Sequence, residues 1–377
     1  MDFLLQAVKE ITWQMPVMWA IGGLLIYLAI RHDMEPALLL PMGFGAILVN
    51  LPLSGVLNQE VGGQPAAGII QWLFEVGIEA SEAMPLLLFI GIGAMIDFGP
   101  VLSNPKLLFF GAAAQFGIFF TVLLAGFFFD FKDAAAIGII GAADGPTSIL
   151  VSQVLKSSKA GAIAVAAYSY MALVPIIQPA VIKVCTTKKE RAIRMKYSPM
   201  GVSKLTRILF PLVTTLIAGL IAPASVSLVG FLMFGNLLRE CGVLGRLSET
   251  AQNSLAQLVT LLLGITIAFQ MRGSEFLRLD TLLIMALGLV AFVFDTAAGI
   301  FFAKGVNLFS KKNKINPMIG AAGISAFPMS ARVVQKMGLQ ADPQNHLLMH
   351  AVGANVAGQV ASVIAGGVML TLVPLMI

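Results

Sequence analysis

Long apolar segments, separated by short polar loops, follow one another along the chain. Segment 107–129 carries no charged residue, and segment 281–303 carries Asp295 alone. A membrane-spanning helix needs about 20 predominantly apolar residues. The pattern therefore predicts an all-α, polytopic membrane protein. The other apolar segments expected to form helices are 13–30, 34–51, 66–80, 84–96, 160–184, 209–221, 225–238, 254–271 and 346–377.

Two further apolar segments, 134–155 and 315–334, are interrupted by glycine and proline residues. The run Ile-Gly-Ala-Ala at 140–143 recurs at 319–322. A break in the backbone at membrane depth is tolerated only where it lines a site or is buried in protein. We therefore expect both segments to form broken hairpins that enter the membrane and return to the same side.

The two halves of the chain carry these features in the same order, which predicts two inverted repeats. Inverted repeats with broken segments near the bilayer midplane are typical of transporters. The expected parts are an extra N-terminal transmembrane helix in 1–33, repeat 1 in 34–184 with its hairpin at 134–155, a basic cytoplasmic linker in 185–208, and repeat 2 in 209–377 with its hairpin at 315–334.

Charge sets the expected orientation. The linker 185–208 and the loop 304–314 are rich in lysine and arginine, and short basic loops stay in the cytoplasm. The loop 130–133 has two acids and one lysine and falls outside. Hairpin 134–155 then enters from outside and hairpin 315–334 from inside. We expect a cytoplasmic N-terminus, an external C-terminus and a bacterial inner-membrane location.

Composition supports the membrane assignment and limits the classes of function. The chain is 58% hydrophobic and 11% charged, against about 25% charged residues in soluble domains. The net charge of +5 is concentrated in two loops, so it indicates orientation and not nucleic-acid binding. The two cysteines, Cys185 and Cys241, fit neither a metal site nor an obvious disulfide. No phosphate-binding loop is present, which argues against ATP hydrolysis.

Asp144 is the strongest candidate for chemistry. It follows the break in the first hairpin, in the run Gly-Ala-Ala-Asp-Gly-Pro-Thr at 141–147. Burying an acid in a bilayer costs about 2.5 to 3.5 kcal/mol or more, so such acids usually bind an ion or carry a proton. The alternative is structural, because Asp-Gly-Pro-Thr is also a good start for a helix.

The second hairpin offers neutral oxygen ligands and one cation. Asn316, Ser325 and the freed carbonyl groups suit a hard monovalent ion such as Na⁺, whereas Arg332 could clamp a carboxylate or extend toward the interface. Asn355, in the last span, could be a ligand or could join two helices by a hydrogen bond. Tyr170 could transfer a proton or hydrogen-bond Asp144, or simply pack in the core. For Asp295 we expect a structural hydrogen bond.

At these positions the sequence resembles a known family. The run at 141–147, the residues Asn316, Gly320 and Ser325, the triplet 330–332 and the run at 353–358 are similar to the β subunits of the Na⁺-translocating biotin-dependent decarboxylases. These subunits serve complexes that act on oxaloacetate, glutaconyl-CoA, methylmalonyl-CoA or malonate. The resemblance implies a membrane subunit that decarboxylates carboxybiotin and couples this reaction to Na⁺ export and proton uptake.

The resemblance also implies roles and partners. Asp144, Tyr170 and Ser325 would be catalytic, and Arg332 would bind the substrate. The Na⁺ ligands would be Asp144, Asn316, Ser325 and Asn355. The implied partners are a carboxyltransferase α subunit, a biotin-carrier subunit that presents the carboxybiotin, and a small single-span γ subunit. We also expect contact with membrane lipids, a homo-oligomeric assembly and no nucleic-acid partner.

Two alternatives stay open from the residues alone. An ion-coupled secondary transporter of a small carboxylate would carry similar broken hairpins. A purely structural membrane subunit would leave the buried Asp144 unexplained. The sequence does not settle which acid the complex decarboxylates, or whether segment 66–80 crosses the membrane fully.

Overall fold

The computed structural model describes residues 7–61, 64–80, 82–195, 201–221, 223–310 and 314–376. Residues 1–6 of the predicted N-terminal element and residues 196–200 of the predicted linker lie outside this part. The all-α prediction is confirmed, because the described chain is helical apart from one short hairpin of strands. That hairpin pairs β1 (Gln59–Val61) with β2 (Gln64–Ala66) in the polar loop after the second predicted segment.

The helical elements follow the predicted segments closely. In chain order they are α2 (Gln14–His32), α3 (Pro36–Val49), α4 (Ile69–Phe74), η1 (Glu75–Glu79), α5 (Ala83–Met95), α6 (Gly99–Ser103), η2 (Pro105–Leu107), α7 (Leu108–Ala114), α8 (Phe116–Ala125), α9 (Phe131–Ile139), η3 (Ile140–Ala142), α10 (Gly145–Val154), α11 (Ala160–Cys185), α12 (Lys188–Arg191), α13 (Lys204–Ile221), η4 (Pro223–Ser225), α14 (Val226–Glu240), α15 (Gly245–Thr250), η5 (Ala251–Leu255), α16 (Ala256–Ile267), η6 (Ala268–Met271), α17 (Gly273–Phe276), α18 (Leu279–Phe309), α19 (Met318–Ala321), α20 (Met329–Ala341) and α21 (Leu348–Met376).

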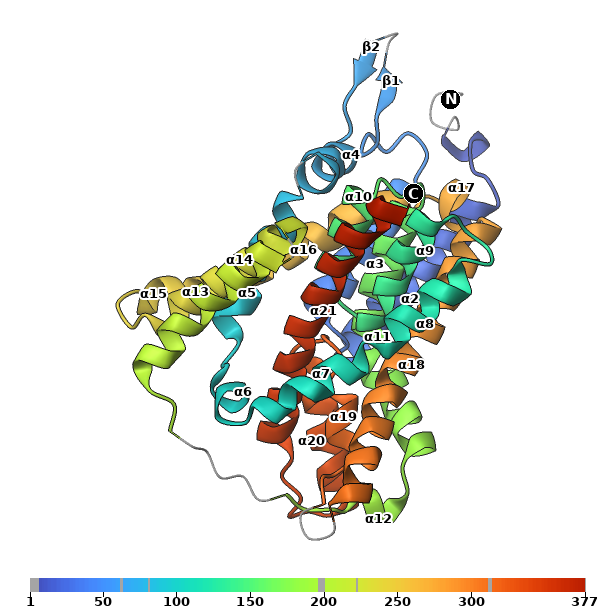
Figure 1. The fold of residues 1–377 in the computed structure, drawn as a ribbon. Coiled ribbons are helices and arrows are strands. Elements are labelled where there is room, and N and C mark those ends of the chain that lie inside the picture. The colour runs from blue at the N-terminus through green and yellow to red at the C-terminus, as the bar shows by residue number, and fades with distance from the viewer. Residues whose placement is uncertain are drawn as a thin grey trace.

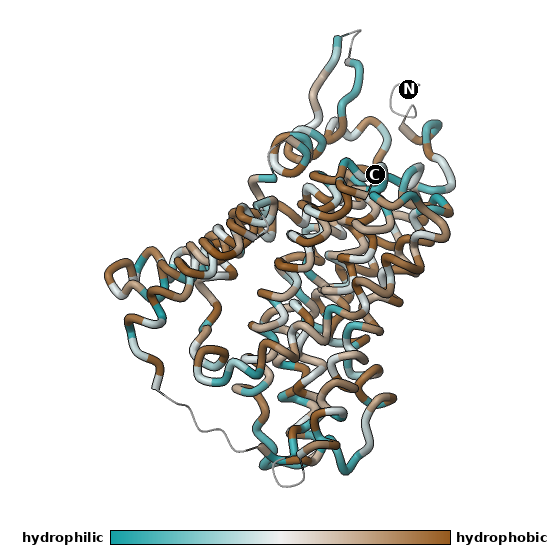
Figure 2. The backbone as a smooth tube through the Cα atoms, viewed as in Figure 1, coloured by the Kyte–Doolittle hydropathy of each residue, from teal (hydrophilic) through white to brown (hydrophobic). Residues whose placement is uncertain are grey.

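Six stretches of helix in the described chain are long and apolar enough to cross a membrane. They are Gln14–His32, Pro105–Ala125, Ala160–Cys185, Gly245–Met271, Leu279–Phe309 and Leu348–Met376. Segment 66–80, whose crossing the sequence left open, forms α4 and η1, and these join α5 in a pair bent by 66°. Figure 2 shows hydrophilic residues toward the two ends of the bundle and hydrophobic ones around its middle, as a membrane protein requires.

The two ends of the described chain lie at the same end of the bundle. Figure 1 shows that α2 begins beside α17 and that α21 ends at the same end of the bundle, whereas α12 of the basic linker lies at the opposite end. The prediction of a cytoplasmic N-terminus and an external C-terminus expects these ends at opposite ends of the bundle, whereas the described ends lie together. The reason is the packing of α2 against α3 as a hairpin, which turns at residues 33–35 and leads the chain back to its starting end. The side of the membrane that each one faces stays a prediction.

Each of the two predicted broken segments forms helices on either side of a break, and the two segments approach each other from opposite ends of the bundle. That they re-enter the membrane stays a prediction. In Figure 1, α9 and α10 lie near the end that holds the termini, and α19 and α20 lie near the end that holds α12. The second hairpin is longer than the predicted 315–334, because α20 continues to Ala341. The last turns of α20 carry polar residues on one side and apolar residues on the other. The run of apolar residues in the sequence therefore ends before the helix does.

Close helix contacts fix the hairpins in the bundle. A Cβ atom added to Gly320 of α19 would lie 1.9 Å from the carbonyl oxygen of Gly299 on α18. A Cβ atom on Gly358 of α21 would lie 2.1 Å from the carbonyl oxygen of Gly323 in the second hairpin. Glycine at these points lets the backbones touch, which is how membrane helices gain van der Waals contact. The second hairpin is thus wedged between α18 and α21.

Candidate functional site

The break in the first hairpin places Asp144 at the start of a helix. The chain leaves η3 through Ala143, whose φ of 52° is left-handed and strained for a residue with a side chain. Asp144 is extended, and its Oδ1 accepts a hydrogen bond from the Thr147 backbone N–H at 3.3 Å. The side chain therefore caps α10, with Pro146 in the first turn as helix starts prefer. Strain of this kind collects at functional sites.

The second carboxylate oxygen of Asp144 accepts three hydrogen bonds from neutral side chains. The donors are Thr147 Oγ1 at 2.8 Å, Gln359 Nε2 at 3.0 Å and Ser362 Oγ at 2.9 Å. No ion pair of Asp144 with a basic residue is found in the described part of the chain. Neutral donors and a helix start stabilise a buried carboxylate without neutralising its charge.

Sequence reasoning did not find Gln359, Ser362 or Thr147 as partners of Asp144. A signal was present, because Asn355, Gln359 and Ser362 are spaced by four and then three residues and so share one face of α21. All three are buried, and a buried polar face on a membrane helix points to a polar site.

The tips of the two hairpins meet beside Asp144. The backbone N–H of Ser325 donates to the carbonyl oxygen of Ala142 at 3.0 Å, and the Ser325 hydroxyl donates to the same oxygen at 2.7 Å. Asp144, Ser325 and Gln359 line a cavity of about 250 Å³, here called the Asp144 cavity. The structure thus brings together Asp144 of the first hairpin and Ser325 of the second, which are both predicted site residues.

Asn355 joins this cluster from α21. Its Nδ2 donates to the carbonyl oxygen of Ile324, the residue before Ser325, at 2.6 Å. Its Oδ1 is buried and has no hydrogen-bond partner among the described residues. A buried acceptor without a partner is costly, so this oxygen is available to a ligand.

Asn316 lies elsewhere and is fully engaged. Its Nδ2 donates to the carbonyl oxygens of Arg191 and Ile193, both at 2.9 Å, and its Oδ1 accepts from the Met318 backbone N–H at 3.0 Å. The side chain ties the base of the second hairpin to the chain just after α12. The prediction that Asn316 and Ser325 share one ligand set is not met in this structure, because the residues lie at the base and at the tip of the hairpin.

Tyr170 does not contact Asp144. Its hydroxyl donates to the carbonyl oxygen of Met285 on α18. The tyrosine beside Asp144 is Tyr168, whose ring lies against Gly145: a Cβ atom on that glycine would be 2.6 Å from the ring. The Tyr168 hydroxyl is buried without a hydrogen-bond partner in the described part of the chain. The prediction named Tyr170 and not Tyr168, although both tyrosines lie on α11.

Asp295 occupies a separate position on the continuous helix α18. One of its carboxylate oxygens accepts the backbone N–H of Ile118 at 3.1 Å, at the start of α8. This contact agrees with the structural hydrogen bond expected from the sequence. The other oxygen is buried and unpartnered among the described residues.

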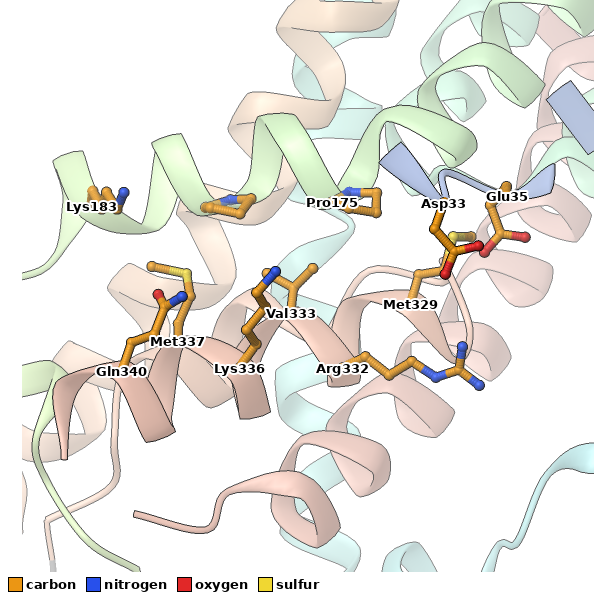
Figure 3. A pocket seen from close by; sticks show the side chains of 11 residues that line it. Asp33, Glu35, Pro175, Lys183, Met329, Arg332, Val333, Lys336, Met337 and Gln340 are labelled. Atoms are coloured by element: carbon orange, nitrogen blue, oxygen red, sulfur yellow. The ribbon is translucent and has the colours of Figure 1, made fainter. Parts of the chain in front are cut away.

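Arg332 projects into a second cavity of about 400 Å³, here called the Arg332 cavity. Figure 3 shows its guanidinium group facing the carboxylates of Asp33 and Glu35, with Lys336 and Lys183 further along the same cavity. Arg332 is exposed, and its guanidinium makes no hydrogen bond or ion pair with any described residue. A free guanidinium in a cavity is well suited to binding a carboxylate in a bidentate manner.

The turn between α2 and α3 supplies the acids of the Arg332 cavity. Asp33 and Glu35 have φ values of 52° and 37°, so two residues with side chains adopt the left-handed conformation in one turn. Burial raises the pKa of the Glu35 carboxyl, and the Arg332 guanidinium opposes this by lowering it. Glu35 and Met329 line both cavities, which places them between Arg332 and Asp144.

A multi-pass bundle with two opposed hairpins and a buried carboxylate between their tips defines an ion-translocating class of membrane protein. Comparison with known proteins makes this specific. Residues 14–373 match the family described as the Na⁺-transporting oxaloacetate decarboxylase beta subunit. The chain belongs to this family and is a membrane subunit of a decarboxylase.

Individual relatives cover almost the whole chain. The glutaconyl-CoA decarboxylase subunit beta of Acidaminococcus fermentans is 48% identical over 365 residues, which cover 96% of this chain and 94% of that protein. The methylmalonyl-CoA decarboxylase subunit beta of Propionigenium modestum is 47% identical, and the oxaloacetate decarboxylase beta chain of Klebsiella pneumoniae is 46% identical, each covering 94% of both chains. These findings support the decarboxylase subunit and not the alternative of an ordinary secondary transporter.

Proposed function

We propose that this chain decarboxylates carboxybiotin, presented by a carrier subunit, and couples the loss of CO₂ to Na⁺ export and proton uptake. The observation that carries the proposal is the placement of Asp144. Its carboxylate lies at the contact of two opposed hairpins, held by neutral donors, in a cavity that shares Glu35 and Met329 with the cavity of the unpaired Arg332. A site for a cation and a site for an anion are thus neighbours.

Arg332 is the proposed holder of the carboxylate of carboxybiotin. A guanidinium group matches the geometry of a carboxylate, and this one has no competing partner within hydrogen-bond reach in the described chain. Its cavity of about 400 Å³ is within the usual range of small-molecule sites. The partner that delivers the substrate would dock near this cavity.

The Na⁺ site is proposed at the contact of the hairpin tips. Asp144 would supply the charge, and Ser325, Asn355 and the newly found Thr147 and Ser362 would supply neutral oxygens. Hydroxyl groups can turn to present a lone pair, so the donors that now hold Asp144 can become ligands. No group of three or more His, Cys, Asp or Glu side chains suited to a metal ion occurs among the described residues. One carboxylate with neutral oxygens suits a monovalent ion that must also leave.

The proposal changes the predicted role of Asn316 and leaves that of Tyr170 untested. Asn316 is assigned to the closure of the hairpin base, because both of its polar atoms are engaged there. The catalytic role of Tyr170 stays a prediction, since its hydroxyl is bonded to Met285 and not to the site.

Two inverted repeats are the proposed basis of coupling. Contacts between equivalent elements support this, because α10 of the first hairpin packs against α11 and α21, and α20 of the second hairpin packs against α21 and α11. The carboxyltransferase α subunit, the biotin-carrier subunit, the single-span γ subunit and the homo-oligomer are proposed from the family relationship. Exporting one charge against 100 mV costs about 2.3 kcal/mol, which sets the minimum work per ion.

The test is release of CO₂ from free carboxybiotin by the chain in proteoliposomes. The proposal expects release that requires Na⁺ and moves Na⁺ across the membrane. Release that is the same with and without Na⁺, or uptake of a carboxylate with no biotin compound present, would contradict it.

A further inference from the structure

The proposed reaction needs a proton donor beside the carboxylate that Arg332 holds, and neither Asp144 nor Tyr170 lines the Arg332 cavity. When the N–C bond of carboxybiotin breaks, CO₂ leaves and the electron pair stays on the ring nitrogen. That nitrogen must take a proton to form biotin. Arg332 holds its proton too firmly to give it away at neutral pH, so the donor must be another group in the same cavity.

Glu35 has the position that such a donor needs. It lines the Arg332 cavity together with Arg332, and it also lines the Asp144 cavity. Asp33, from the same turn, lines the Arg332 cavity but does not line the Asp144 cavity. Figure 3 shows the Glu35 carboxyl group beside Asp33 and facing the end of Arg332. No hydrogen bond or ion pair holds the Glu35 carboxyl among the described residues.

We propose that Glu35 is the general acid of the decarboxylation, protonating the biotin ring nitrogen as CO₂ leaves. This inference rests on the proposed function. The O–H bond of the Glu35 carboxyl breaks, an N–H bond forms on biotin, and the resulting Glu35 carboxylate takes a proton from water before the next turnover. The chemistry needs no oxidant or other reactant, and the proton count is one per CO₂.

The surroundings raise the pKa of the Glu35 carboxyl. Burial disfavours the charged form, and the neighbouring Asp33 carboxylate adds to this, whereas Arg332 opposes it. The other charged groups that face the cavity are Lys183 on α11 and Lys336 on α20. When Arg332 binds the carboxylate of the substrate, its effect on Glu35 is partly cancelled, which further favours the acid form.

The decisive experiment compares the wild-type chain with Glu35→Gln in proteoliposomes that contain Na⁺, using free ¹⁴C-carboxybiotin and subtracting its decay without protein. Single-turnover CO₂ release should fall by about 100-fold in the variant, the lower end of what general acids contribute. The apparent KM for carboxybiotin should change by less than threefold. Glu249→Gln, an exposed glutamate of α15 outside both cavities, is the matched control and should behave as wild type.

The pH profile gives a readout that a structural role would not change. The donor is the protonated form, so the wild-type rate should be highest below the Glu35 pKa and fall about tenfold per pH unit above it. This limb should disappear in Glu35→Gln and persist in Asp33→Asn. Glu35→Asp, which keeps an acid on a shorter side chain, should retain the limb at a reduced rate and remains informative if Glu35→Gln does not fold.

The outcomes separate this inference from the proposed function. If the wild-type chain releases no CO₂ from carboxybiotin, the proposed function fails and Glu35 has no reaction to serve. If the wild type is active and Glu35→Gln, or Glu35→Asp in its place, matches its rate and pH profile, Glu35 is not the donor while the proposed function stands.

Discussion

At the scale of single residues, the site is built on the hydrogen bonds of one buried carboxylate. Asp144 is held by three neutral side chains and one backbone N–H, and two of the side chains come from α21. A hydrogen bond to a charged group contributes about 1.5 to 3 kcal/mol. Loss of one donor therefore stabilises the Asp144 carboxylate less. A proton then competes more strongly with Na⁺ for the Asp144 oxygens.

Ser362→Ala removes one of these donors and should weaken Na⁺ binding. We expect the Na⁺ concentration for half-maximal CO₂ release to rise about tenfold, since 1.4 kcal/mol corresponds to a factor of ten. Ser152→Ala is the control, because the Ser152 hydroxyl is also buried in this region but donates to the Ile149 carbonyl and not to Asp144. Equal Na⁺ dependence in the two variants would show that Ser362 does not support the ion site.

Sequence analysis identified some residues of the site and missed others, and each of these outcomes has a physical cause. Asp144 is visible because an acid at a helix break in a bilayer is costly. Gln359 and Ser362 were missed because polar residues on a membrane helix usually join helices. Asn316 was grouped with Ser325 because both lie in one motif, but the distance along a hairpin from base to tip cannot be read from spacing. Glu35 was missed because only folding brings the turn of α2 and α3 to Arg332.

At the scale of elements, the contact between hairpin tips is the part that translocation must change. Ser325 donates twice to the carbonyl oxygen of Ala142, so the two tips are joined by backbone and side chain together. An ion bound between them can leave only if the tips or their neighbours move. The broken hairpins themselves were predictable from glycine and proline, whereas the pairing of Ser325 with Ala142 was not, because it depends on how far each hairpin reaches.

A disulfide between the tips should stop turnover. The double variant Ala142→Cys with Ser325→Cys, in a chain whose Cys185 and Cys241 are replaced by serine, places two thiols where the backbones already touch. The reduced double variant should need more Na⁺ than the parent chain, because Ser325 is a proposed ligand. Oxidation should abolish the remaining Na⁺-dependent CO₂ release, and reduction should restore it to the level of the reduced variant. Each single variant should be unaffected by oxidation. Full turnover in the oxidised double variant would show that the tips stay together during the cycle.

At the scale of the whole molecule, the two ends of the bundle carry different loops. The linker around α12 is basic, whereas the end with β1, β2 and both described termini lies opposite it (Figure 1). Basic short loops stay in the cytoplasm, so the opposite end should face outward. The charge pattern of the sequence thus predicts which end of the bundle faces the cytoplasm. It could not give the side of the N-terminus, because that depends on α2 and α3 forming a hairpin.

Labelling of single cysteines checks this orientation. In the cysteine-free background, Glu60→Cys lies in the β1 strand and Lys188→Cys in α12, and both residues are exposed. A membrane-impermeant maleimide should label Glu60→Cys in intact cells and should label Lys188→Cys only after the membrane is opened. The reverse pattern would invert the proposed direction of transport.

The central claim is that Asp144 binds the exported Na⁺ and links it to the loss of CO₂. Its most direct test is Asp144→Asn in proteoliposomes with free carboxybiotin, measuring CO₂ release and ²²Na⁺ movement in the same sample. Asparagine keeps the size and can still cap α10, so the fold should be retained. The account predicts loss of Na⁺ transport and of the Na⁺ dependence of CO₂ release. Unchanged Na⁺-dependent release with Na⁺ transport in this variant would contradict the claim and place the ion site elsewhere.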